Sequence, residues 1–277
     1  MRRSLPHRTA PGGGVDYGDR VKIALMDSGI GLLAAAAAVR RLRPDADLVL
    51  SSDPDGMPWG PRTPEDLTRR ALVVARAAAA HHPDALIVAC NTASVHALPA
   101  LRAELEPAVP VIGTVPAIKP AAAAGGAVAI WATPATTGSP YQRALIRDFA
   151  GAVEVTEVPC PGLADAVQHA DESAVDRTIA AAAALTPRGA RAVVLGCTHY
   201  ELVAERIRAA LGRPVALYGS AGAVAAQALR RVGVPAAPGA APGGRLMVLF
   251  SGREAALSEQ ALSYAEARLL RTVTPAH

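Results

Sequence analysis

Two cysteines of this chain lie in closely similar surroundings that could support acid–base chemistry. Cys90 lies in "DALIVACNTAS" and Cys197 in "RAVVLGCTHYE", and each follows a run of branched apolar residues and precedes polar residues that include a threonine. The pattern predicts that each cysteine ends a strand and begins a helix. A helix N-terminus supplies unpaired N–H groups and partial positive charge, which lower the pKa of a thiol and bind carboxylates. We therefore expect two reactive thiols beside a site for a small polar anion.

Each thiol has a candidate acid–base partner. Asp27 lies in "MDSGIG" at the end of the first apolar run, and His199 comes two residues after Cys197. Two thiols that face each other could remove a proton from one side of a carbon atom and return one to the other, which inverts that carbon. Hydrogen bonds to a substrate carboxylate would stabilise the charge that develops. Structural alternatives stay open, since free cysteines are commonly buried apolar residues and Asp27 could cap a helix.

Neutral hydrogen-bonding side chains accompany both cysteines and suit a polar organic anion better than a metal ion. These side chains are Asn91, Thr92, Thr198 and Ser94. The three cysteines have neither CxxC nor CxxH spacing, which argues against a zinc site or a disulfide framework, and we predict a structural role for Cys160. Neither Lys22 nor Lys119 has a motif that would support pyridoxal phosphate. "MDSGIG" lacks the full dinucleotide-binding spacing because residue 34 is Ala. We expect no metal and no cofactor.

The elements that must position these residues alternate along the chain. Branched apolar runs alternate with helical patterns from residue 21 onward, which indicates an α/β protein with parallel sheets and a ligand site at the carboxyl ends of the strands. Strands are predicted over 21–26, 46–52, 84–90, 109–113, 126–133, 153–160, 190–197 and 214–219. Helices are predicted over 31–42, 63–82, 95–105, 138–150, 163–184 and 199–211, with two more segments around the apolar run 245–250. Thr63 and Asp66 form a variant of the capping box at the start of the second helix.

Composition narrows the class of protein. The 277 residues are 51% hydrophobic and 3% aromatic with a formal net charge of +4, so Ala, Val and Leu must build the core. Dense basic patches with interleaved aromatic residues are absent from the sequence, which argues against nucleic-acid binding. The alanine runs are too short and weakly apolar to cross a membrane, and the basic N-terminus lacks the apolar stretch of a secretory signal. Three thiols without a disulfide pattern predict a cytoplasmic location.

Five ordered motifs resemble those of a known family. "MDSGIGLL", "CNTAS", "ATPATTGSPYQRAL", "VPCP" and "LGCTHY" occur in the order seen in glutamate racemases, which are cofactor-independent enzymes of the aspartate/glutamate racemase superfamily. The resemblance covers about residues 22–225. It implies two similar α/β domains with parallel sheets and an active site in the cleft between them. We expect a disordered extension at 1–20, a first domain of 21–115 plus 219–277, and a second domain of 116–218.

The resemblance also implies roles for particular residues. Cys90 and Cys197 match the catalytic cysteines, with Asp27 and His199 as their respective partners. The substrate-binding positions match Ser28, Asn91, Thr92, Thr133, Thr136 and Thr198, and those of the loop "DPDGMPWG" match Asp53, Pro58, Trp59 and Gly60. Thr133 and Thr136 could instead only cap the following helix. The implied function is interconversion of L- and D-glutamate, which supplies D-glutamate for peptidoglycan. The implied partner is a small amino acid, and a homodimer is one assembly compatible with the sequence.

The chain departs from the family pattern at several positions. The departures are Trp59 for Tyr, Pro54 for Thr, Gln168 for the Glu that supports the histidine, Glu201 for Pro, and Gly219 for Asp. They leave the two thiols in place but change their surroundings. Two alternatives therefore stand beside glutamate racemisation. One is a specialised paralogue that acts on aspartate or a biosynthetic intermediate, and the other is a non-catalytic binding protein with the same fold.

Overall fold

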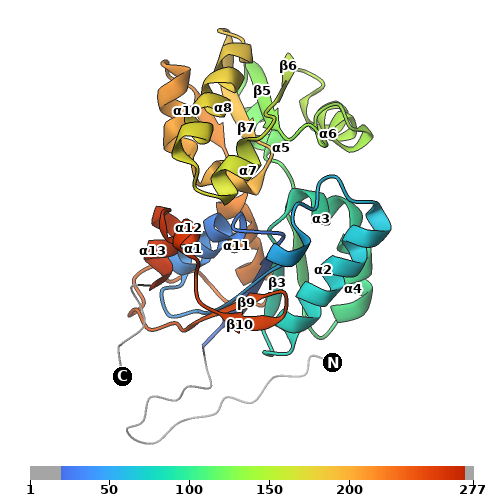
Figure 1. Cartoon of the computed structure of the whole chain (residues 1–277), viewed down its shortest axis with the longest axis vertical. Coiled ribbons are helices and arrows are strands. Elements are labelled where there is room, and N and C mark those ends of the chain that lie inside the picture. The colour runs from blue at the N-terminus through green and yellow to red at the C-terminus, as the bar shows by residue number, and fades with distance from the viewer. Residues whose placement is uncertain (1–19, 272–277) are drawn as a thin grey trace, which may run out of the picture.

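Two sheets, one parallel and one parallel except for a single antiparallel pair, are each covered by helices and form the upper and lower parts of the molecule in Figure 1. The computed structural model describes residues 20–271. Most of the predicted N-terminal extension therefore lies outside the described residues, whereas Arg20 lies inside them and donates from Nη1 to the carbonyl oxygen of Gly243 at 2.6 Å. The lower part takes its strands from both ends of the described chain, and the upper part takes its strands from the middle.

The lower sheet has the strand order β10-β9-β2-β1-β3-β4. Its strands are β1 (Lys22–Asp27), β2 (Asp47–Ser52), β3 (Ala85–Val88), β4 (Val111–Gly113), β9 (Leu246–Phe250) and β10 (Arg253–Ala255). All neighbouring strands are parallel except β9 and β10, which form an antiparallel pair. The segment 245–250 was predicted only as an apolar run, and the structure places it as a strand beside β2.

Side chains of the lower sheet alternate between two helical layers. Ile23 and Leu25 of β1 belong to the core that includes helices α1 (Leu32–Leu42), α11 (Ala221–Arg231) and α13 (Ala265–Arg271). Ala24 and Met26 belong to the core on the opposite face, with helices α2 (Pro64–Ala79), α3 (Asn91–His96) and α4 (Leu98–Leu105). This alternation follows from the two-residue period of a strand. Because both faces are covered, the strands are continuous apolar runs.

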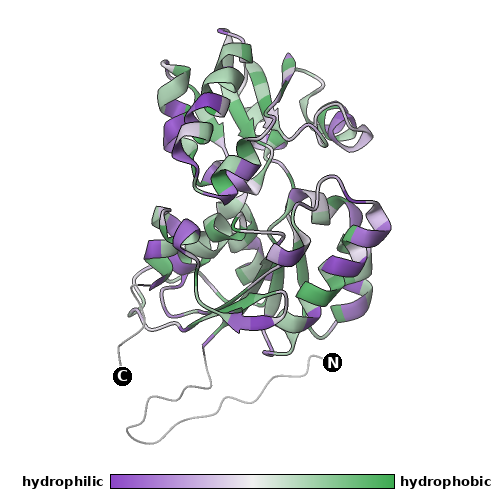
Figure 2. Ribbon diagram, in the orientation of Figure 1, coloured by the Kyte–Doolittle hydropathy of each residue, from purple (hydrophilic) through white to green (hydrophobic). Residues whose placement is uncertain are grey.

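The upper sheet has the order β6-β5-β7-β8, and all its neighbours are parallel. Its strands are β5 (Ala127–Ala132), β6 (Val155–Pro159), β7 (Ala190–Leu195) and β8 (Ala216–Tyr218). The helices of this part are α5 (Ile118–Ala123), α6 (Pro140–Ala150), α7 (Leu163–Gln168), α8 (Glu172–Leu185), α9 (Thr198–Glu201) and α10 (Ala204–Leu211). In Figure 2 the strands of both parts are mainly hydrophobic, while hydrophilic residues gather on the covering helices.

Side-chain packing joins the two parts, in addition to the chain segments that cross between them. One buried cluster contains Leu25 and Ile87 of the lower sheet as well as Val193 and Leu195 of the upper sheet, so apolar packing continues between them. Tyr264, between α12 (Glu259–Leu262) and α13, donates its hydroxyl to the carbonyl oxygen of Val167 at the end of α7, at 2.6 Å. The predicted division at residues 115/116 and 218/219 falls between the sheets, and we keep it as a proposed division.

Most predicted elements are present, but some differ: the predicted helices 95–105, 163–184 and 199–211 are each divided in two, and α5 and β10 were not predicted. The segment 199–211 was predicted as one helix but forms two, α9 and α10, separated by Leu202 and Val203. The charged strand β10 was not predicted, because its sequence "REA" has no apolar alternation. Thr63 caps α2 as predicted, since its hydroxyl accepts from the backbone N–H of Asp66. Within residues 20–271, none of the helices combines the length and the apolar character needed to cross a membrane.

Candidate active site

The two cysteines of the sequence motif lie at the carboxyl edges of the two sheets. Cys90 follows β3 and is the N-cap of α3, and Cys197 follows β7 and is the N-cap of α9, as predicted. Asp27 ends β1, the strand directly beside β3. The loops that carry the thiols are joined by one hydrogen bond, in which Asn91 Nδ2 donates to the carbonyl oxygen of Gly196 at 2.7 Å.

Gly31 shows how tightly residues of the two parts converge. A Cβ added at Gly31 would lie 2.4 Å from Asp27 Oδ2, 2.4 Å from Thr198 Oγ1 and 2.6 Å from His199 Nδ1. Asp27 belongs to the lower sheet, whereas Thr198 and His199 belong to the upper part. The three polar atoms therefore surround one point that only glycine leaves unobstructed. The structure thus brings together three of the residues expected from the sequence.

Asp27 is a buried carboxyl group that titrates near neutrality. Its side chain is only 1% exposed, and burial raises its pKa from 3.8 to about 7, although contacts with Cys90 and Ser28 oppose the rise. Oδ1 accepts from the backbone N–H of Ser28 at 2.7 Å. Oδ2 is buried without a hydrogen-bond partner among the described residues. This oxygen is therefore available to accept a proton.

Both thiols hold their protons more strongly than we expected from their helix N-termini. Burial and the charge of Asp27 raise the pKa of Cys90 well above 9.0. Burial raises the pKa of Cys197 to about 12, although the N–H groups of His199 and Tyr200 oppose the rise. The expected depression is wrong because desolvation of the thiolate outweighs the partial charges of two helices of only six and four residues. A neighbouring base must therefore assist formation of either thiolate.

His199 is placed to act as such a base for Cys197. Its Nδ1 lies 3.9 Å from Cys197 Sγ, and its Nε2 lies 3.1 Å from Gln168 Oε1. Burial of the imidazole lowers its pKa from 6.5 to about 4, because the charged form is poorly solvated there. The ring is therefore neutral at physiological pH and can accept a proton.

The third cysteine lies apart from this arrangement. Cys160 follows β6, is buried, and donates its thiol to the carbonyl oxygen of Val158 at 3.4 Å. Burial raises its pKa to about 12. These contacts agree with the structural role predicted for Cys160.

Several polar side chains named as substrate-binding candidates lie around the thiols or at the same sheet edge. Ser28 follows Asp27, Asn91 and Thr92 begin α3, and Thr198 begins α9. Asn91 Oδ1 is buried and lacks a hydrogen-bond partner within residues 20–271. Thr133 and Thr136 lie in the turn after β5, the neighbour of β7, and the Thr133 hydroxyl donates to Thr136 Oγ1 at 3.2 Å. Thr133 and Thr136 do not cap α6, because Ser139 fills that position.

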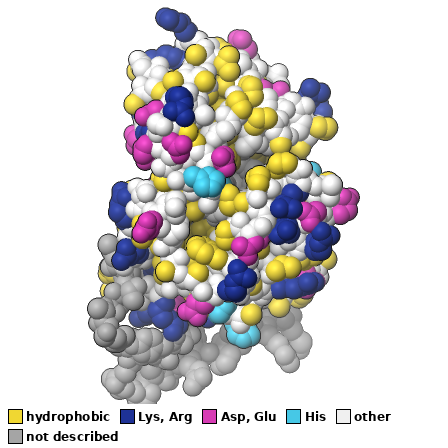
Figure 3. Space-filling model, in the orientation of Figure 1, with side chains coloured by type: hydrophobic (Ala, Val, Ile, Leu, Met, Phe, Trp, Pro, Cys, Tyr) yellow, Lys and Arg dark blue, Asp and Glu magenta, His cyan; other side chains and the backbone are white. Residues whose placement is uncertain are grey.

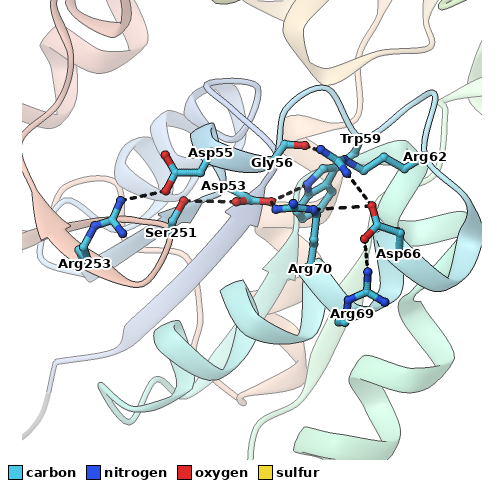
Figure 4. Close-up of polar contacts among 10 residues, drawn as sticks. All are labelled: Asp53, Asp55, Gly56, Trp59, Arg62, Asp66, Arg69, Arg70, Ser251 and Arg253. Carbon is cyan, nitrogen blue, oxygen red and sulfur yellow. Dashed lines mark hydrogen bonds and ion pairs between the residues drawn. The ribbon is translucent and has the colours of Figure 1, made fainter.

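The loop 53–60 is held by a polar network that Figure 4 shows in detail. Asp53 is 4% exposed and accepts from Trp59 Nε1 at 3.0 Å, Arg70 Nη1 at 3.3 Å and the Ser251 hydroxyl at 3.2 Å. Both carboxylate oxygens of Asp53 are therefore occupied by donors of this chain. Trp59 is 1% exposed and belongs to the same buried cluster as Cys90. Asp53 and Trp59 thus fix the loop.

The same network connects the loop to α2 and to the β9–β10 hairpin. Asp66 of α2 binds Arg62, Arg69 and Arg70, and Arg253 of β10 binds Asp55 at 2.9 Å. Pro58 is exposed. Gly60 faces the upper part, because a Cβ there would lie 3.9 Å from Ala135 Cβ. Substrate contacts by Asp53, Pro58, Trp59 and Gly60 stay a prediction.

Glu201 and Gly219 are two departures from the family pattern that the structure connects. Glu201 Oε1 accepts from the backbone N–H and the hydroxyl of Ser220 at 2.8 and 2.9 Å, and both its carboxylate oxygens accept from the N–H of Ala221 at 3.2 Å. The carboxylate thereby caps the N-terminus of α11. A Cβ at Gly219 would lie 2.2 Å from Glu201 Oε2. Glycine at 219 therefore makes room for the carboxylate at 201, a pairing that the sequence did not reveal.

The residues present offer no evident metal site in the described part of the chain. Within residues 20–271, groups of three or more His, Cys, Asp or Glu side chains close enough to hold a metal ion are absent.

On the face shown in Figure 3, basic and acidic side chains are interspersed between apolar ones. The polar groups around the two thiols are instead those that would bind a small organic acid.

Comparison with known proteins supports the same kind of chemistry as the geometry of the site. The family model of Asp/Glu/hydantoin racemases matches residues 31–228, which include both thiols. The glutamate racemase of Roseiflexus sp. (strain RS-1) is 38% identical over 208 residues, covering 73% of this chain and 76% of that protein. The glutamate racemase of Pseudomonas putida (strain W619) is 35% identical over 213 residues, covering 75% and 80%.

Solved structures agree with this relationship. The crystal structure of Escherichia coli glutamate racemase in complex with L-glutamate and the activator UDP-MurNAc-Ala is 28% identical, with a TM-score of 0.73 and coverage of 88% of this chain and 93% of that one. Glutamate racemase isoform RacE1 from Bacillus anthracis is 29% identical, with a TM-score of 0.67 and coverage of 84% and 89%. The family model, which matches residues 31–228, and the relative that is 38% identical over 73% of this chain establish that this chain belongs to the Asp/Glu/hydantoin racemase family.

Proposed function

We propose that this protein interconverts L- and D-glutamate without a cofactor, by proton transfer between the substrate Cα and the thiols of Cys90 and Cys197. One observation carries the proposal: each thiol follows a strand of a different sheet, and each has its own buried proton acceptor, Asp27 or His199. The glutamate substrate follows from the relatives named above, whose names specify glutamate.

The proton transfers balance in both directions. In one direction Asp27 takes the proton of Cys90, and the resulting thiolate removes the Cα proton of the bound amino acid. Cys197 then donates its thiol proton to the opposite face of that carbon, which inverts it. This turnover leaves Asp27 protonated, Cys90 as a thiol and Cys197 as a thiolate. After product release, Asp27 gives its proton to solvent and Cys197 takes one from solvent, which restores the resting site. From that resting state the reverse reaction begins when His199 takes the proton of Cys197.

The polar groups beside the thiols supply the substrate contacts in this proposal. The backbone N–H groups at the starts of α3 and α9, with the hydroxyls of Thr92 and Thr198, bind the carboxylate on which charge develops. Asn91 Oδ1 accepts from the substrate ammonium group, which satisfies its unpaired buried oxygen. Thr133 and Thr136, which follow the adjacent end of β5, also bind the substrate in this proposal. Near-complete burial of Asp27 and Cys90 excludes water from the proton path.

The biological role proposed is supply of D-glutamate for peptidoglycan synthesis in the cytoplasm. A homodimer belongs to this proposal as the expected assembly. The specialised paralogue for aspartate would show its own substrate preference in the same assay. A binding protein would leave unexplained the two buried proton acceptors, each in contact with or close to a separate thiol.

The test follows Cα exchange and inversion separately. The purified protein is incubated with L-glutamate or D-glutamate in deuterated water, while proton NMR follows loss of the Cα–H signal and circular dichroism follows inversion. The wild type should exchange and invert both enantiomers. Cys90→Ser and Cys197→Ser should each lose inversion and exchange only one enantiomer, and the two variants should differ in which one, since a single thiol reaches one face. Cys160→Ser serves as the matched control and should behave as the wild type. Absence of both exchange and inversion in the wild type would refute the proposal.

A further inference from the structure

We propose that Gln168 is a positioning residue that holds the proton of neutral His199 on Nε2 and thereby directs the unprotonated Nδ1 towards the thiol of Cys197. This inference rests on the proposed function for its catalytic meaning, but the hydrogen bonds that support it do not. Gln168 ends α7 in the upper part, and it reaches both the imidazole and the β1–α1 turn of the lower part.

The orientation of the Gln168 amide is fixed by a backbone donor. The N–H of Ile30 donates to Gln168 Oε1 at 2.9 Å. A backbone N–H can only donate, so the atom that faces it must be the amide oxygen and not the amide nitrogen. The approach depends on Gly29, because a Cβ there would lie 2.1 Å from the same oxygen. The turn that follows Asp27 therefore receives the Gln168 oxygen in one orientation.

The same oxygen determines which imidazole nitrogen carries the proton. Gln168 Oε1 lies 3.1 Å from His199 Nε2, and an amide oxygen can only accept a hydrogen bond. Nε2 must therefore be the protonated nitrogen. Since burial keeps the ring neutral, Nδ1 carries the lone pair, and Nδ1 is the nitrogen 3.9 Å from Cys197 Sγ. The thiol thus faces an acceptor and not a donor.

An amide also differs from a carboxylate in its effect on the charge of His199. The groups that surround the imidazole are Asp27 from the lower part, Cys197 ahead of α9, and the neutral Gln168 on α7. A carboxylate in place of the Gln168 amide would stabilise the imidazolium form and raise the pKa of His199. Protonated His199 cannot accept a proton from Cys197. Gln168 therefore keeps this base available at lower pH than a carboxylate would.

The direct test measures the tautomer of His199 in the intact protein. The protein is labelled with ¹⁵N-histidine, and long-range ¹H–¹⁵N correlation spectra distinguish the two neutral tautomers and the imidazolium form. The His199→Asn variant assigns the His199 signals among the seven histidines. Between pH 6 and 8 the wild type should show the Nε2–H tautomer of His199 without titration. The Nδ1–H tautomer, or a titration midpoint in that range, would overturn the inference even if the protein racemises glutamate.

The Gln168→Glu variant tests the role of the neutral amide. Its His199 midpoint should rise by about one pH unit or more, a roughly tenfold gain in proton affinity. If glutamate is racemised, the acid limb of kcat/KM should move to higher pH equally in both directions, because the equilibrium constant between the two enantiomers is one. Gln227→Glu makes the same chemical change on the outer face of α11, where Gln227 binds Arg230, and should leave both readouts unchanged. Equal His199 midpoints in Gln168→Glu and the wild type would refute the role of Gln168. A shifted midpoint without any racemisation would instead refute the proposed function alone.

Discussion

The buried carboxyl group of Asp27 should make the stability of this protein fall as pH rises through neutrality. Its pKa is raised from 3.8 to about 7 in the folded chain, so between these values the folded state binds more protons than the unfolded state. Stability is then lost as pH rises across that window. A rise of about three pH units corresponds to about 4 kcal/mol, since each unit is worth about 1.36 kcal/mol.

Asp27→Asn isolates this effect because an amide of the same shape does not titrate. The Asn oxygen can still accept from the Ser28 N–H, whereas the new amide nitrogen takes the place of the unpartnered Oδ2 and adds a cost of about 1–3 kcal/mol that is independent of pH. The expected observation is therefore a difference between two curves. The free energy of unfolding of Asp27→Asn relative to wild type should rise by about 4 kcal/mol between pH 4 and pH 8.

Urea denaturation followed by tryptophan fluorescence gives both curves. Trp59 and Trp131 are buried in the lower and upper parts respectively, so the signal reports unfolding of each part. Titrations common to both proteins cancel in the difference. Parallel curves for the wild type and Asp27→Asn across pH 4–8 would show that burial does not raise the Asp27 pKa. Asp27 would then be fully ionised at neutrality but a weaker base, and the argument that its raised pKa suits it to take the proton of Cys90 would lose its basis.

Three further changes have expected outcomes. As pH falls from 6.5 to about 4, the free energy of unfolding of the wild type should decrease by about 3 kcal/mol, because only the unfolded histidine is protonated there. His199→Asn should lack this decrease, which the same denaturation curves would reveal. Gly31→Ala should reduce kcat at least about 100-fold and destabilise the fold by about 1–3 kcal/mol, because its methyl group obstructs the converging polar atoms; wild-type kinetics would contradict this. Gly219→Ala, just before α11, should cost about 1–2 kcal/mol by displacing the Glu201 cap, whereas Gly222→Ala within α11 meets no neighbour within 4 Å and should cost nothing; thermal unfolding compares the two.

The sequence predicts the main framework of the site because parallel strands have a simple geometry. Branched apolar runs identify β1, β3 and β7, and the residue that follows such a strand must lie at the carboxyl edge of its sheet. Cys90 and Cys197 could therefore be placed before the structure was known. The short charged strand β10 could not be predicted, since its three residues carry no apolar period.

The pKa values of buried groups and the contacts between residues far apart in the chain cannot be predicted from local sequence patterns. A helix start is visible in sequence, but the amount of solvent removed from Cys90 or Cys197 is not, and burial decides the direction in which their pKa values move. Glu201 and Gly219 each depart from the family pattern, but nothing in the sequence connects the two departures. Only the structure shows that the Glu201 carboxylate fills the space left by Gly219. The hydrogen bond from Tyr264 to α7 likewise depends on packing between distant segments.

Burial explains the protonation of all four candidate catalytic groups through one physical cause. Desolvation favours the neutral form of every ionisable group, so it raises the pKa of Asp27, Cys90 and Cys197 and lowers that of His199. Only Asp27, with a pKa of about 7, lies near its midpoint at physiological pH. Protonation changes of the substrate-free site near neutrality therefore belong to the Cys90 side. On the Cys197 side the neutral pair of thiol and imidazole, held by the neutral amide of Gln168, changes its charge only when a proton is transferred.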